Sequence, residues 1–97
     1  MIDVLTACQA RAARAMLNWS VRKLAIRSKI SDSSVRRIEV GFGAPENVTI
    51  DLCVKLRAYF ESRGFHFTFD DTIGPGVSWN RAATRAERRL MERRGEP

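Results

Sequence analysis

The sequence predicts a mainly α-helical fold: a compact bundle of four to five helices, followed by a short C-terminal β-hairpin and a basic C-terminal helix or tail. Three observations support this prediction. Apolar residues recur at helical spacing in four successive segments. Small hydroxyl residues precede the first three of these segments, where they can cap helix N-termini. Aromatic and polar residues then alternate from Phe65 onward, which is typical of a strand.

The composition indicates one globular domain. The chain has 97 residues, of which 44% are hydrophobic and 29% are charged, and its formal net charge is +6. Such a composition is typical of a folded chain. No apolar run approaches the roughly 20 residues of a membrane span, and the N-terminus lacks the pattern of a secretory signal. We therefore expect a cytoplasmic protein that does not associate with membranes.

The first helix is expected over residues 6–17. Thr6 can cap its N-terminus, and Gln9 follows three residues later, as a capping box requires. The apolar residues fall on one side of this helix. The polar residues between them are expected to face water: Arg11, Arg14 and Asn18.

Two short helices follow, over residues 21–28 and 32–40, with Ser20 and Ser31 as their N-caps. A short link joins them, and Gly41 ends the second helix. The apolar residues expected to point into the core are Leu24, Ala25, Ile30, Val35 and Ile38.

A fourth helix is expected over residues 48–63, with Gly64 at its C-terminal end. The hairpin would then consist of a strand at 65–69, a turn at 70–76 and a short returning strand at 77–79. Two strands alone are only marginally stable in water, so the hairpin must pack on the helices or on a second copy of the chain.

One face of the expected hairpin is apolar. Its residues are Phe65, Phe67, Phe69, Val77 and Trp79. This face either belongs to the core of a single chain or forms a dimer contact, because aromatic residues are favoured at the centres of interfaces.

The last expected helix covers residues 81–94, after Asn80. Residues 81–97 contain six Arg and three Glu, which is a net charge of +3. This tail either reaches the backbone of a nucleic acid or is a solvated helical or disordered segment.

Positive charge is also concentrated in the two short helices. Residues 21–40 contain six Lys and Arg against two Asp and Glu, which is a net charge of +4. A focused basic patch favours a polyanionic partner, and nucleic acid is the commonest one. A solvated basic face is the alternative.

The two short helices have the outline of a helix-turn-helix. The major groove of DNA admits one helix, whose first turn needs small or hydrogen-bonding side chains to approach the bases. Serines supply these here, and one turn later Arg36 and Arg37 can reach guanine or phosphate. Basic residues of the preceding helix and of the link can reach the DNA backbone. The alternative is that the polar residues of both helices simply face solvent. The candidate DNA-binding residues are Ser31, Asp32, Ser33, Ser34, Arg36, Arg37, Arg22, Lys23 and Lys29.

The order and spacing of these segments resemble a known family. The stretch ARAMLNWS at residues 13–20 resembles the first-helix signature of XRE-type, phage-repressor-like regulators, and VRRIE at residues 35–39 resembles their recognition helix. The segments 64–67 and 74–77 resemble a strand hairpin found in a bacterial subset of these regulators. The resemblance covers Leu5 to Val77 and implies a compact helical bundle that binds double-stranded DNA as a homodimer.

Three residues depart from the family's usual pattern. Val21 stands where Gln usually anchors the helix on a phosphate, and Asp32 stands where a basic or neutral residue is usual. Lys29 stands where Gly usually lies in the turn, and would there adopt a left-handed conformation at a cost of about 1 kcal/mol.

The resemblance implies a sequence-specific DNA-binding transcriptional regulator, a repressor or autoregulator that acts as a homodimer on a palindromic operator. The three departures favour the alternative, a protein-interaction module of the antitoxin or antiactivator type whose partner is a toxin or an activator. In either case residues 1–64 would form the helix-turn-helix domain, residues 65–79 the hairpin and residues 80–97 the arginine-rich tail.

We expect no enzymatic activity, cofactor or metal. The single histidine, His66, cannot form a histidine cluster. Cys8 and Cys53 are too far apart in sequence for a zinc motif and are expected to be buried, reduced thiols.

Overall fold

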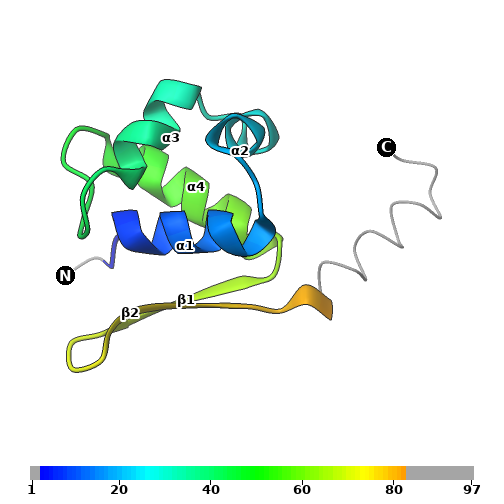
Figure 1. Cartoon of the computed structure of the whole chain (residues 1–97). Coiled ribbons are helices and arrows are strands. Elements are labelled where there is room, and N and C mark those ends of the chain that lie inside the picture. The colour runs from blue at the N-terminus through cyan, green and yellow to red at the C-terminus, as the bar shows by residue number, and fades with distance from the viewer. Residues whose placement is uncertain (1–2, 83–97) are drawn as a thin grey trace.

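Four helices precede a two-stranded antiparallel hairpin in the computed structural model of the chain, which describes residues 3–82 (Figure 1). This confirms the expected mainly helical fold. The expected last helix falls almost entirely outside the described residues. The elements are α1 (Ala7–Leu17), α2 (Val21–Ser28), α3 (Asp32–Glu39), α4 (Ile50–Ser62), β1 (Phe65–Asp70) and β2 (Gly74–Trp79).

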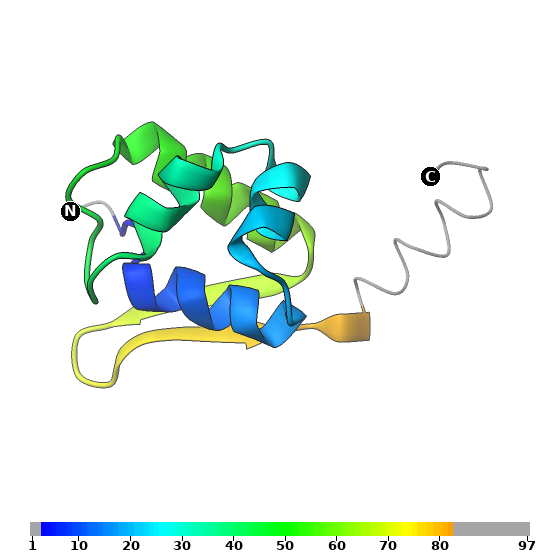
Figure 2. The same cartoon turned by 45° about the horizontal axis from the view of Figure 1, so that its top comes forward.

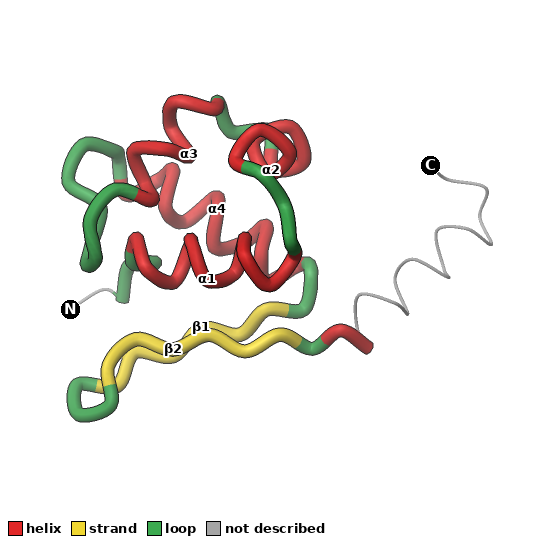
Figure 3. The backbone as a smooth tube through the Cα atoms, viewed as in Figure 1, coloured by secondary structure: helices red, strands yellow, loops and turns green. Residues whose placement is uncertain are grey.

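The hairpin lies along one side of α1, and α2 and α3 lie on the other side (Figures 1 and 3). Strand β2 contacts α1, and strand β1 contacts α4. The turned view shows α2 and α3 together on the side of the molecule away from the hairpin (Figure 2). Within residues 3–82, no helix is long and apolar enough to cross a membrane.

Each of these four helices begins after a Ser or Thr whose side chain accepts a backbone N–H from the first turn. Three of these N-caps are those that the sequence predicts, namely Thr6, Ser20 and Ser31, and the capping box between Thr6 and Gln9 is complete. The fourth cap, Thr49, was not predicted, and α4 therefore begins two residues later than expected.

Two of the helix ends depend on a non-glycine residue in the left-handed conformation. Asn18 ends α1 with φ of 58°, and Lys29 ends α2 with φ of 61°. The structure thus confirms the conformation expected of Lys29, which costs roughly 1 kcal/mol relative to glycine. The N–H of Ile30 then donates to the carbonyl of Ala25, so the turn leads directly toward α3.

The hairpin turn is shorter than the sequence predicts. Gly74, Pro75 and Gly76 were expected in the turn but lie in β2, where Pro75 pairs with Phe69. The carboxylate of Asp70 accepts the N–H groups of Thr72 and Ile73, which closes the chain reversal early. A proline is tolerated in β2 because both strands of a two-stranded sheet are edge strands.

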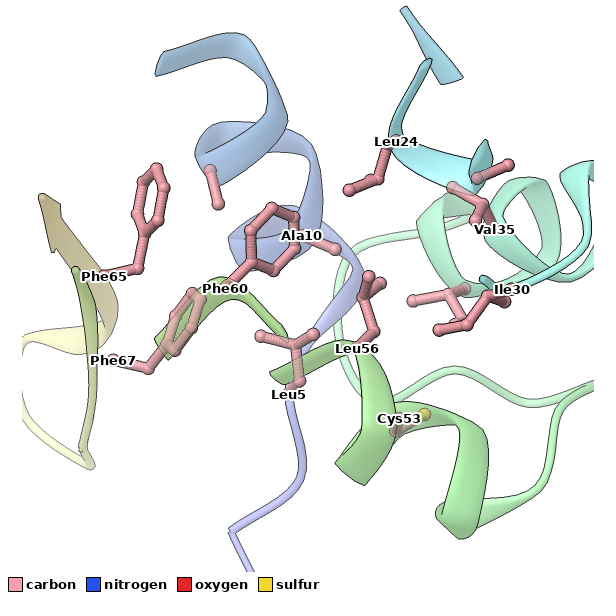
Figure 4. Packing of buried hydrophobic residues seen from close by; sticks show 13 residues of the cluster. Leu5, Ala10, Leu24, Ile30, Val35, Cys53, Leu56, Phe60, Phe65 and Phe67 are labelled. Carbon is pink, nitrogen blue, oxygen red and sulfur yellow. The ribbon is translucent and has the colours of Figure 1, made fainter. Parts of the chain in front are cut away.

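The core lies between the hairpin and the helices. Phe60 of α4 is at its centre, with its ring centroid 5.5 Å from that of Phe65 and 6.0 Å from that of Phe67 (Figure 4). Leu24, Val35 and Leu56 extend this cluster toward α2 and α3. Burying each such side chain stabilises the fold by about 1.5–3 kcal/mol.

Gln9 joins α1 to both strands through its buried side chain. Its amide nitrogen donates to the carbonyls of Thr68 and Gly76, each at 2.9 Å, and its amide oxygen accepts the N–H of Thr6 at 3.0 Å. The sequence predicts only the last of these bonds. The other two hold the hairpin against α1.

Candidate nucleic-acid interface

The outward face of α3 is set by its buried residues. Val35 and Ile38 are fully buried, and Leu24, Ala25 and Ile30 of α2 and the link are buried with them, as predicted. Ser33, Arg36 and Arg37 are consequently exposed on the opposite face of α3, while Asp32 and Ser34 are half-buried. Small hydroxyl groups and two arginines therefore share one face of an eight-residue helix.

The serine hydroxyls at the start of α3 are ordered by one another. Ser31 Oγ accepts the N–H of Ser34 and also donates to Ser34 Oγ at 2.8 Å. Ser33 Oγ lies 3.3 Å from Ser31 Oγ. The hydroxyls are thus held near the first turn of α3, where a ligand lying across the helix end would meet them.

Asp32 pairs with Arg36 one turn further along α3. Asp32 Oδ2 lies 3.3 Å from Arg36 Nη2 and 3.4 Å from Arg36 Nε. The side chains of Arg36 and Asp32 are 65% and 47% exposed, so solvent screens this pair and it contributes little to stability. It does reduce the positive charge that Arg36 offers to a ligand. Arg37 makes no such pair with any residue between 3 and 82.

A shallow hollow between α2 and α3 brings two of the predicted phosphate contacts to this face. Arg22 and Lys29 line it together with Ser31 and Asp32. Lys55 Nζ of α4 donates to the carbonyl of Lys29 at 3.1 Å and adds a further positive charge beside the turn. The sequence does not indicate a role for Lys55, because the residues around it do not show that α4 packs beside the turn at Lys29.

The third predicted phosphate contact, Lys23, does not join this group. Its ammonium lies 5.1 Å from the centroid of the Trp19 ring, on another side of α2 from Arg22. Helical geometry explains the separation, because adjacent residues on a helix are rotated by about 100°. The expected basic set is therefore split between two surfaces.

The C-terminal end of α3 is held by two arginines of α1 that were expected to face water. Arg14 pairs with the buried Glu39, and its Nη1 also donates to the carbonyl of Trp19. Arg11 donates to the carbonyls of Glu39 and Gly41. The hydrogen bond to Glu39 raises the pKa of Arg14 above its ordinary value. These bonds fix the orientation of α3 relative to α1.

The loop after α3 is fastened to the N-terminus of α1. The carbonyls of Phe42 and Gly43 accept the N–H groups of Cys8 and Ala7, at 3.2 and 2.8 Å. Val40 and Phe42 are nevertheless each 72% exposed. An anchored backbone thus presents apolar side chains next to Arg37, a feature that the sequence did not indicate.

The aromatic hairpin face is part of the core of this chain. Phe65 and Phe67 are 4% and 3% exposed, Val77 packs on the same cluster, and Trp79 stacks on Phe65. Phe69 is covered in part by the guanidinium of Arg57, 4.9 Å from its ring centroid. Phe65 and Phe67 thus belong to the core of a single chain, which is one of the two alternatives for this face, and a dimer contact through it stays a prediction.

Within residues 3–82, no three His, Cys, Asp or Glu side chains come together in a group that could hold a metal ion. His66 is exposed, Cys53 is buried and Cys8 is half-buried, so the expected burial holds for one thiol only. Burial raises the pKa of the Cys53 thiol, which makes it a poor nucleophile.

No protein-family model matches this chain, and no curated protein matches it in sequence.

Proposed function

We propose that this protein is a sequence-specific DNA-binding transcriptional regulator that uses α2, the turn and α3 as a helix-turn-helix. One observation carries the proposal. The exposed face of α3 with Ser33, Arg36 and Arg37 adjoins the hollow with Arg22 and Lys29. Such a surface combines groups that can read base edges with groups that can bind phosphates.

In this proposal α3 lies in the major groove with its N-terminal turn nearest the bases. Arg37 reaches guanine, whose O6 and N7 accept a bidentate pair of hydrogen bonds. The hydroxyls of Ser33 and Ser34 hydrogen-bond to base edges or phosphates. Arg22 and Lys29 bind the sugar-phosphate backbone and set the orientation of α3.

A single α3 would read only a few base pairs, so we also propose a homodimer on a palindromic operator. Because Phe65 and Phe67 are buried within one chain, we propose that the second copy uses another surface. The anchored, exposed side chains of Val40 and Phe42 beside α3 support a contact there. Occupation of a promoter by such a dimer would block polymerase and so repress transcription.

The alternative function is a protein-interaction module, and Asp32 favours it. This carboxylate lies at the start of α3, where it repels a phosphate backbone, and it pairs with Arg36. In that case the helical bundle would serve as a scaffold for binding a toxin or an activator.

Selection of bound duplexes from a random pool, followed by a salt titration, distinguishes the two functions. We expect an enriched palindromic sequence and an affinity that falls steeply and linearly on a log–log plot against salt. Binding of all duplexes with equal affinity would remove the sequence-specific part of the proposal. No binding at low salt would favour the protein-interaction module.

A further inference from the structure

Trp19 lies in the link between α1 and α2, and three cationic side chains surround its indole ring. Lys23 Nζ lies 5.1 Å from its ring centroid, and the guanidinium carbons of Arg27 and Arg63 lie at 5.9 and 5.2 Å. Lys23 and Arg27 belong to α2, whereas Arg63 is the C-cap of α4. Three positive charges from two elements thus converge on one half-buried aromatic ring.

Tyr59 of α4 lies within the field of the same charges. Burial raises the pKa of the Tyr59 hydroxyl above its ordinary value, and the positive charges of Arg63 and Arg27 partly oppose this rise. Tyr59 is half-buried, as Trp19 is. The aromatic and cationic residues together form one surface, which we call the Trp19 surface: Trp19, Lys23, Arg27, Tyr59 and Arg63.

The Trp19 surface is separate from the face that carries the proposed DNA contacts. Lys23 and Arg27 are one turn apart and form one outward row of α2. Arg22, on another side of α2, and Lys29, the C-cap of α2, line the hollow beside α3. A duplex lying on α3 would therefore leave the row of Lys23 and Arg27 uncovered.

Two cations of this surface, Lys23 and Arg27, have no acidic partner within the described part of the chain. Both side chains are exposed. A second copy of the chain carries the same net charge of +6 and is a poor electrostatic match. An acidic partner would relieve the mutual repulsion of the cations.

We propose that the Trp19 surface binds an acidic segment of another protein, in which carboxylates pair with Lys23 and Arg27 and apolar groups pack beside Trp19. The residue types support a protein partner, because Trp, Tyr and Arg are the residues enriched at the energetic centres of protein interfaces. Arginine also matches the geometry of a carboxylate with two parallel hydrogen bonds. The proposal does not depend on DNA binding by α3.

The test compares two double variants that each remove two exposed cations. Lys23→Ala with Arg27→Ala alters the Trp19 surface, and Arg22→Ala with Arg36→Ala is the matched control on the other face. The probe is a fluorescently labelled Glu-rich peptide of about ten residues, long enough to span such a surface in an extended form. Its affinity for the full chain is measured by anisotropy at low salt, and thermal unfolding verifies that each variant folds.

We expect the Lys23 and Arg27 double variant to bind the peptide at least about tenfold more weakly, whereas the control changes its affinity by less than about twofold. Equal losses in both variants would overturn the proposal, because they would show that only net charge matters. No peptide binding by the unaltered chain would overturn it as well.

Duplex DNA as a second probe separates this proposal from the proposed function. If the Lys23 and Arg27 double variant loses affinity for duplex and keeps its affinity for peptide, the Trp19 surface belongs to a nucleic-acid interface and the proposal is wrong. If no form of the chain binds duplex but the peptide results are as expected, the proposed function fails and the acidic-segment site stands.

Discussion

Glu39, the last residue of α3, accepts hydrogen bonds from both Nε and Nη2 of Arg14 in α1. Nε lies 2.8 Å from Oε2 and 3.1 Å from Oε1, and Nη2 lies 2.9 Å from Oε1. The pair joins the surface helix α3 to the centre of the bundle. The carboxylate of Glu39 is buried, whereas Arg14 keeps a quarter of its side chain exposed. The orientation of α3 thus depends on one partly buried ion pair as well as on apolar packing.

Removal of Arg14 tests this role. Arg14→Ala leaves a buried carboxylate without its partner, and the free energy of unfolding should fall by about 1–3 kcal/mol, less than for a fully buried pair because solvent reaches the arginine. Urea denaturation measures the change. The control is Arg36→Ala, which breaks the exposed pair with Asp32 and should cost less than about 0.5 kcal/mol. Equal costs for the two variants would contradict the role given to Arg14.

The proposed base contact of Arg37 predicts a loss that depends on DNA sequence. Arg37→Ala should weaken binding to the selected operator by about 1–3 kcal/mol and relax the preference at one base pair in each half-site. Binding to random duplex should change far less. If both affinities fall by the same factor, Arg37 binds phosphate and another residue reads that base pair.

The pair between Asp32 and Arg36 predicts a gain of non-specific affinity. Asp32→Asn removes one negative charge from the face of α3 and frees the guanidinium of Arg36. Binding to random duplex should strengthen, and the log–log salt slope should steepen by about one unit, since one more counterion is released. Asp51→Asn, which alters an exposed carboxylate at the start of α4, serves as the charge-matched control. The same change in both variants would show that Asp32 has no local effect.

The position of Phe67 in the core predicts loss of folding when it is made polar. Phe67→Asp places a carboxylate beside Phe60 and should lower the free energy of unfolding by several kcal/mol, because a buried charge without a partner is strongly disfavoured. Circular dichroism and thermal unfolding measure this. The neighbouring substitution His66→Asp lies on the exposed face of β1 and should be tolerated. A folded, monomeric Phe67→Asp variant would instead support the dimer contact that the sequence suggested.

Local signals allowed most secondary structure to be predicted from the sequence. The hydrogen bonds that cap a helix join residues that lie within one turn of each other in sequence. Hydroxyl caps and helical spacing therefore located the first residues of α1, α2 and α3. The cap of α4 was missed because the irregular segment before it has no apolar period. The strand assignment of Gly74 to Gly76 was missed because glycine and proline usually mark turns.

The sequence by itself thus determined which residues of each element are apolar, and hence which face of α3 points outward. Only the tertiary structure decided which residues contact each face. Phe67 packs on Phe60 of the same chain, Arg14 forms an ion pair with Glu39, and the ammonium of Lys23 lies over the ring of Trp19. The physical reason is that the spacing of apolar residues predicts which side chains are buried, but not which residues they pack against. Those partners are set by contacts between segments far apart in sequence, whose arrangement is specified by the packing of the whole chain.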